Sequence, residues 1–433
     1  MRRAGLVGGL VVVVLAAGIG LVWVRRDRSS GPPHPKAWDA QVLPLVQFVE
    51  EARGLRFHHP VAVEYLSDAD FRRAVADEPA GSPQKQRDDE AVDRALGLPL
   101  GNSGLVAAGN ALSGEGITAY YDDETGKVDV RGTELTVGRR ATIVHELTHA
   151  LQDQHFDLAR LGADRSDDRN AAFEAVVEGD AVRTEYAYVD SLPKADQDAY
   201  DKEQAAGDAY STGIADVPDW LSAETDFPYS VGEAFTEVLA AHGGEEAVDG
   251  ALRTPPPAVA DAMDPERYRR GDQPLAVAAP AAPAGDRVAK RNVFGELRWL
   301  LVLAERVPAA DALRAADGWG GDAYLAYEHQ GRVCVKAEVA GLRPAATDEL
   351  ARALGRWAKA MPAPAGATAG RRGDVVEVAS CDPGEAGLPG SSVRGSQVDE
   401  AVRLLDDRAN AAADKAAGGS AADVDPRLRR GGG

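Results

Sequence analysis

The longest run of residues without a charged side chain lies at the N-terminus, at residues 4–24, and basic residues flank it on both sides. A run of this length can cross about 30 Å of hydrocarbon as an α-helix. A cleaved signal peptide, which is the alternative, normally has a shorter apolar core. Trp23 and the arginines that follow it are typical of an interfacial anchor. The pattern therefore predicts a single-pass transmembrane helix at residues 1–28, followed by a Pro- and Gly-rich linker at residues 29–36.

In the rest of the chain, apolar residues recur either every three or four residues, as in amphipathic helices, or every second residue, as in half-buried strands. The first spacing predicts helices at residues 37–53 (bent near Pro44), 68–76, 85–96, 139–156, 170–192, 292–305, 307–317, 347–361 and 398–416. The second predicts strands at residues 61–66, 117–121, 127–131, 323–327, 332–339 and 374–379. Residues 196–210 are polar and acidic, which is typical of a solvated helix or a loop. The mixture predicts an α+β fold.

Turn and cap residues refine these elements. Ser67, Thr136 and Thr347 are expected to cap the helices that follow them, because their hydroxyl groups can accept a free backbone N–H. The strands at 117–121 and 127–131 flank a stretch rich in turn formers, so we expect a β-hairpin directly before the helix at 139–156.

At 433 residues, the chain can bury one large hydrophobic core or two moderate ones. We expect a main domain at residues 37–290, a smaller α+β unit at 291–382, and a Gly- and Ala-rich, partly disordered tail at 383–433. The 69 acidic and 48 basic residues give a net charge of −21, which argues against nucleic acid as a partner. Two cysteines, Cys334 and Cys381, permit one disulfide without requiring it.

The strongest chemical signal is the run H-E-x-x-H formed by His145, Glu146 and His149. On a helix, two His four residues apart project from the same face, so that they can bind one Zn²⁺ ion. Glu146 then lies beside the metal as the base that takes a proton from water. Only 8 of the residues are His, so the run is rarely formed by chance. The plainer interpretation is an amphipathic helix that carries two solvated His.

A catalytic zinc site needs a third protein ligand. Glu178, in a second predicted helix, is the favoured candidate because it would complete a His₂Glu site. His155 is the rival, since HELTHALQDQH has the spacing of H-E-x-x-H-x-x-G-x-x-H, although Gln152 stands where that pattern has a turn-forming Gly. Glu174 lies one helical turn before Glu178 and could replace it or support the ligands.

Further polar residues are candidates for supporting roles. Asp153 and Asp180 could accept the second ring N–H of the zinc-bound His, although a solvated surface carboxylate is the plainer interpretation of each. Tyr229 and His242 are candidates for the donor that stabilises an oxyanion. A buried structural Tyr and a solvated His are the corresponding alternatives.

The run HELTHALQDQHFDL at residues 145–158, followed by VVEGDA at 176–181, resembles a family of membrane-associated or secreted zinc metallopeptidases of the zincin type. FPYSVGEAF at 227–235 and TPPPAVADAMDPERY at 254–268 are similar to further segments of that family, and the resemblance covers residues 61–339. It departs at Asp264, where the family pattern E-Q-x-x-H-P has a His. The resemblance implies a zincin-like domain that hydrolyses peptide bonds in a peptide or protein substrate.

Together, these observations predict a membrane-anchored zinc metallopeptidase whose catalytic domain lies outside the cytoplasm. His145, His149 and Glu178 are expected to bind Zn²⁺, and Glu146 and Tyr229 to take part in catalysis. The predicted hairpin could hold an extended substrate along its edge strand, or it could be purely structural. The alternative function is a membrane-tethered zinc-binding scaffold with little or no turnover.

Overall fold

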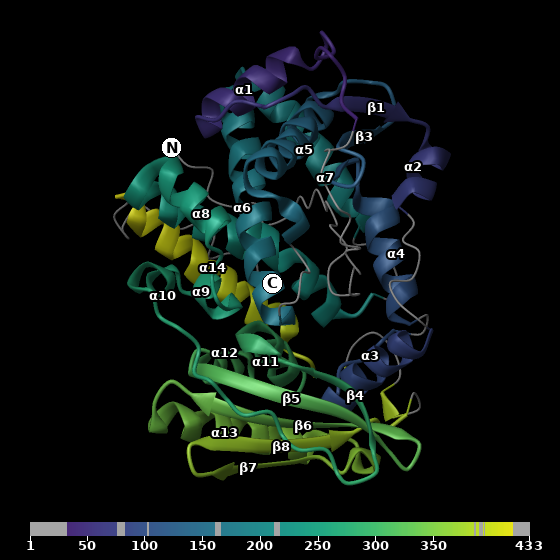
Figure 1. Ribbon diagram of the computed structural model, residues 1–433, viewed down its shortest axis with the longest axis vertical. Helices are drawn as coiled ribbons and strands as arrows, with labels where there is room; N and C mark the ends of the chain where they lie inside the picture. The colour runs from purple at the N-terminus through teal and green to yellow at the C-terminus, as the bar shows by residue number, and fades with distance from the viewer. Residues whose placement is uncertain are drawn as a thin grey trace.

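The computed structural model describes residues 33–75, 83–101, 104–160, 166–211, 217–384, 387–388, 393 and 395–418 (Figure 1). Within these residues the chain forms an α+β fold with two β-sheets. The smaller sheet lies at one end of the molecule, the larger sheet lies at the other, and long helices stand between them. No helix in the described part is long and apolar enough to span a membrane. The expected anchor at residues 1–28 lies outside the described residues, as do the start of the linker and the end of the tail.

The smaller sheet has the strand order β1 (Ala62–Leu66), β3 (Lys127–Arg131), β2 (Ala119–Asp122). Strands β2 and β3 pair antiparallel, which confirms the predicted hairpin, while β1 pairs parallel to β3. Strand β2 is therefore an edge strand. Ser67 accepts the N–H of Asp70 at the start of α2 (Asp68–Val75), as expected of a cap.

The first helix differs from its prediction. Helix α1 runs over Leu43–Arg53, with Pro44 in its first turn, so the proline starts the helix and does not bend it. Proline is well tolerated there because the first backbone N–H groups of a helix have no partner within it. Helices α3 (Pro83–Leu96) and α4 (Leu105–Gly116) lead from α2 to the hairpin.

Four helices form the centre of the molecule: α5 (Val137–Phe156), α6 (Asp167–Ser191), α7 (Lys194–Ser211) and α8 (Asp219–Arg253). Thr136 caps α5 by accepting the N–H of Arg139, as predicted. Helix α8 was not predicted. It is buried along much of its length, so it lacks a one-sided apolar stripe, and it contains Pro228 and a break at Gly244. A residue like Pro228 normally argues against a helix interior.

The larger sheet has the strand order β4 (Arg287–Asn292), β5 (Trp319–His329), β6 (Arg332–Gly341), β8 (Val375–Cys381), β7 (Thr368–Arg372). The edge strands β4 and β7 were not predicted. They are short and half exposed or exposed, so they lack the alternation of a buried strand. Cys334 and Cys381 face each other on β6 and β8 and form a disulfide.

Two local features of this unit differ from their predictions. Strand β5 begins at Trp319, four residues before the predicted strand at 323–327, and the glycines there let the backbone of Leu275 approach: its N–H donates to the carbonyl of Gly320 at 2.7 Å. Thr347 does not cap α13 (Pro344–Ala360), which begins three residues earlier with a proline in its first turn. The Thr347 hydroxyl instead accepts the N–H of Gly341.

The remaining helices join the larger sheet to the centre. They are α9 (Val259–Met263), α10 (Pro265–Arg270), α11 (Gly295–Ala304), α12 (Ala309–Ala316) and α14 (Val398–Ala416), with 3₁₀ turns at Leu158–Arg160 and Ala363–Ala365. One large hydrophobic core joins α8, α11, α12 and α14 to the larger sheet. A second core joins α1 and the smaller sheet to α5. Helices α5 and α6 thus lie where the two cores meet, and they carry the site described next.

Candidate metal centre

His145, His149 and Glu178 come together inside the molecule. Helix α5 supplies both His from adjacent turns of one face, and α6 supplies the Glu. The Nε2 atoms of His145 and His149 lie 3.2 and 3.3 Å from Oε2 of Glu178. One ligand atom from each residue lies within 4.8 Å of the others, and all three side chains are buried. This is the arrangement that two His one turn apart and a carboxylate from a neighbouring helix were predicted to make.

The site holds several buried polar atoms that have no hydrogen-bond partner among the described residues. They are Nδ1 of His145, Nε2 of His149, Oε1 of Glu178, Oε1 of Glu146 and the hydroxyl of Tyr229. Buried polar atoms are normally satisfied, so this group needs an explanation. Two imidazoles and one carboxylate are the donor set of a catalytic zinc site with one position left for water. The residues fit a divalent metal ion, and the donor set suits zinc without excluding related metals.

The charges of the three side chains also suit a cation. Burial raises the pKa of Glu178, but the adjacent His149 and His145 have the larger, opposite effect. The pKa of Glu178 is therefore lowered to about 2, and this carboxylate stays ionised. Burial lowers the pKa of His145, but the carboxylates of Glu178 and Glu185 raise it to about 10. A metal ion that binds here therefore takes the place of protons on the imidazoles.

Glu146 lies beside this group with one oxygen held and the other free. Its Oε2 accepts the backbone N–H of Tyr121, on the edge strand β2, at 2.7 Å. Its Oε1 has no partner among the described residues. Burial raises the pKa of Glu146 to about 7, against the opposing effect of both His. A carboxylate with a pKa near neutrality can both accept and release a proton.

The outer nitrogens of the two imidazoles face oxygen atoms, but not those that the sequence suggested. Nδ1 of His149 donates to Oε1 of Gln152 at 3.0 Å, and Nδ1 of His145 lies 3.2 Å from Oε2 of Glu185. The sequence suggested Asp153 and Asp180, and the hydrogen bonds seen for these two carboxylates go to other groups. Asp153 accepts the hydroxyl of Tyr121 at 2.9 Å. Asp180 is fully buried, and Gln152 connects it to His149.

The two rival ligands lie outside the group. Helix α5 continues without a turn at Gln152, so His155 is directed elsewhere and its Nε2 lies 2.8 Å from the carbonyl oxygen of Arg56. Glu174 lies one turn before Glu178 on α6. Burial raises the pKa of Glu174 to about 8, and the charge of Glu178 adds to this shift.

Of the two candidate oxyanion donors, only Tyr229 lies at the site. Its ring is 6.4 Å from the ring of His145 and nearly parallel to it. Burial raises the pKa of Tyr229 well above its usual value, and Glu178 and Glu174 add to this effect, so its hydroxyl keeps its proton. His242 is exposed, and its Nδ1 binds the carbonyl of Val238 one turn back on α8.

Asp264, the residue that departs from the family pattern, caps a helix. Its Oδ1 accepts the N–H of Glu266 at the start of α10. The side chain is exposed, so in this chain the position has a local structural role.

Comparisons of the chain with models of protein families, with curated proteins and with solved structures found no match. The assignment of a function therefore depends on the site itself.

Proposed function

We propose that the protein is a zinc-dependent metallopeptidase of the zincin type. The observation that carries this proposal is the buried His145–His149–Glu178 group with the free Oε1 of Glu146 beside it. The edge strand β2 also supports the proposal. It precedes α5 in the chain, its Tyr121 N–H binds Glu146, and its free edge could hold an extended substrate. The substrate class is a peptide or protein.

The metal, when bound, supplies a Lewis acid that polarises the scissile carbonyl and acidifies water. Glu146 accepts the proton of the attacking water at Oε1 and later delivers it to the leaving amine. The N–H of Tyr121 holds the other oxygen of Glu146, so the free oxygen keeps its direction. Tyr229 keeps its hydroxyl proton and donates it in a hydrogen bond to the oxyanion that forms on the carbonyl.

We place this catalytic domain outside the cytoplasm, anchored by residues 1–28. The Cys334–Cys381 disulfide supports this placement, because such bonds persist in oxidising compartments.

The test is cleavage of an unstructured protein such as casein by the full chain, with and without a zinc chelator. We expect chelation to abolish cleavage and added zinc to restore it. Glu146→Gln should lower kcat/KM by about 10²- to 10⁴-fold while metal content stays at one ion per chain. Full activity of Glu146→Gln would refute the proposed mechanism.

The second candidate is a zinc-binding scaffold without turnover. The observation that favours it is burial: His145, Glu146, His149 and Glu178 are all 0–2% exposed. A peptide must reach the metal to be cleaved, and burial of these side chains opposes that access. One zinc per chain without any cleavage of casein would support this function over the first.

A further inference from the structure

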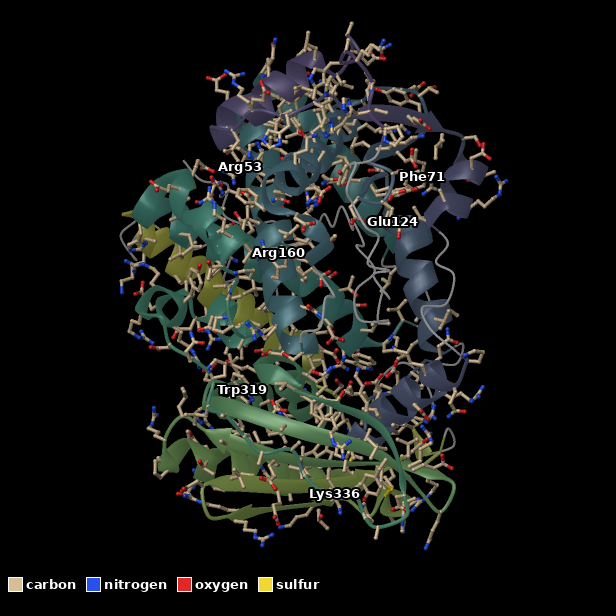
Figure 2. The ribbon with its side chains drawn as sticks, in the orientation of Figure 1. Arg53, Phe71, Glu124, Arg160, Trp319 and Lys336 are labelled. Atoms are coloured by element: carbon tan, nitrogen blue, oxygen red, sulfur yellow. A yellow bond between two sulfur atoms is a disulfide. The ribbon has the colours of Figure 1, made fainter. Side chains whose placement is uncertain are left out.

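A buried chain of hydrogen bonds connects His149 to the end of helix α1. It runs from His149 through Gln152 and Asp180 to Arg53, the last residue of α1. The side chains of Arg53 and Asp180 are 1% and 0% exposed. Arg53 lies 96 residues before His149 in the sequence, and Figure 2 labels it where α1 meets the central helices.

The direction of each hydrogen bond in this chain follows from the chemistry of its members. Arg53 can only donate, so Asp180, which accepts from its Nε at 2.9 Å, acts as an acceptor. Gln152 Nε2 donates one proton to Oδ2 of Asp180 at 2.9 Å and the other to the carbonyl of Val177 at 3.0 Å. Both amide protons of Gln152 are thus used on acceptors.

This arrangement fixes which nitrogen of His149 carries a proton. The amide of Gln152 must present Oε1 to His149, because the reverse orientation would set that oxygen against the acceptor oxygens of Asp180 and Val177. Oε1 can only accept, so Nδ1 of His149 must donate. In the neutral ring Nε2, which points to Glu178, then carries the lone pair that a metal ion can bind.

The far end of the chain holds Asp180 in place. Arg53 also donates to Asp249 at 2.8 Å and to Glu245, both on α8. Arg183 donates to Oδ1 of Asp180 at 3.0 Å and pairs with Glu245. Asp180 therefore has a donor on each oxygen, and its position depends on α1, α6 and α8 together.

We propose that Arg53 and Gln152 are positioning residues for the metal: they fix the tautomer and the ring orientation of His149 through Asp180. This inference rests on the proposed metal site. It assigns to α1, which carries none of the three proposed ligands, an indirect effect on metal affinity.

The test compares zinc affinity, by competition with a chromophoric chelator, in full-length variants. Gln152→Met and Arg53→Met should weaken zinc binding about 10- to 100-fold. Arg53→Lys should restore part of the loss, since an ammonium can still pair with Asp180. Gln154→Met is the matched control for the amide: Gln154 is also on α5, but it binds the backbone of His58 and His59. Arg298→Met is the control for a buried ion pair, since Arg298 pairs with Asp93 and Glu224.

A second measurement separates positioning from a purely structural role. In ¹⁵N NMR spectra of the metal-free chain, the wild type should show a slowly exchanging Nδ1–H on His149, and Gln152→Met should lose it. Unchanged zinc affinity and an unchanged Nδ1–H signal in folded Gln152→Met protein would overturn the inference. A wild-type chain that binds no zinc would instead overturn the proposed function, while the NMR comparison would still decide the role of Gln152.

Discussion

Gly179 on α6 and Gly232 on α8 face each other where the two helices cross, and neither position has room for a side chain. A Cβ on Gly179 would meet the carbonyl oxygen of Gly232, and a Cβ on Gly232 would meet the carbonyl oxygen of Ala175. Glu178 precedes the first glycine, and Tyr229 lies one turn before the second. The close crossing therefore brings a predicted ligand and a predicted oxyanion donor to the same place.

We expect Gly232→Ala to push the two helices apart. Because the added methyl group meets backbone that is held in a helix, the variant should lose about 1–3 kcal/mol of the free energy of unfolding, measured with urea. Gly250→Ala is the matched control on α8: its Cβ would meet nothing within 4 Å, so it should be neutral or stabilising by up to about 1 kcal/mol. Equal effects of the two substitutions would show that the crossing does not depend on Gly232.

The third ligand can be identified by comparing Glu178→Gln, Glu174→Gln and His155→Ala. Only Glu178 places an oxygen beside both imidazoles, so Glu178→Gln should weaken zinc binding at least about tenfold, measured by competition with a chelator. His155→Ala should bind zinc like the wild type, since Nε2 of His155 faces the backbone of Arg56. A larger loss in His155→Ala than in Glu178→Gln would contradict the geometry.

Local sequence signals predicted much of the fold around the site. The cap at Thr136 and the helix that follows it, the hairpin before it and the helix at residues 398–416 are all present in the structure. These elements have clear periodicity and clear end signals. Helix α8 lacks both because it is buried along much of its length, and the edge strands β4 and β7 lack an apolar face.

The site, like the fold, was predicted only where the signal is local in the sequence. The spacing of His145, Glu146 and His149 is a local property of one helix, so the sequence could predict their common face. The partners of the imidazoles were not predicted, because Gln152 is held by Asp180 and Asp180 by Arg53, which lies 127 residues before Asp180. Such contacts depend on how the helices pack, which a single sequence does not display.

The Cys334–Cys381 disulfide is expected to stabilise the larger sheet. It closes a loop with a sequence separation of 47, for which the loss of chain entropy in the unfolded state corresponds to about 4 kcal/mol. The double variant Cys334→Ala and Cys381→Ala should lose about 2–4 kcal/mol in urea unfolding. A reducing agent should destabilise the wild type but not the double variant, and equal sensitivity of both would contradict this role.

Asp168, at the start of α6, should make the protein less stable as the pH rises. It is buried beside Asp322 of β5 and Asp261 of α9, with Arg267 of α10 as an opposing charge. Burial raises the pKa of Asp168 to about 8, and Asp322 adds to the shift. The unfolded chain ionises this group near pH 4. Between about pH 4 and pH 8 the folded state therefore holds a proton that the unfolded state has lost.

Stability contributed by this protonated group is thus complete below about pH 4 and declines as the pH rises toward 8, by at most about 1.4 kcal/mol for each pH unit. Asp168→Asn, which cannot ionise and can still accept the N–H of Val259, should flatten that part of the curve of unfolding free energy against pH. Asp167→Asn is the matched control: Asp167 is exposed and pairs with Lys290, so its loss should cost less than about 1 kcal/mol and leave the slope unchanged. The same slope in wild type and Asp168→Asn would mean that Asp168 does not hold its proton in the folded protein.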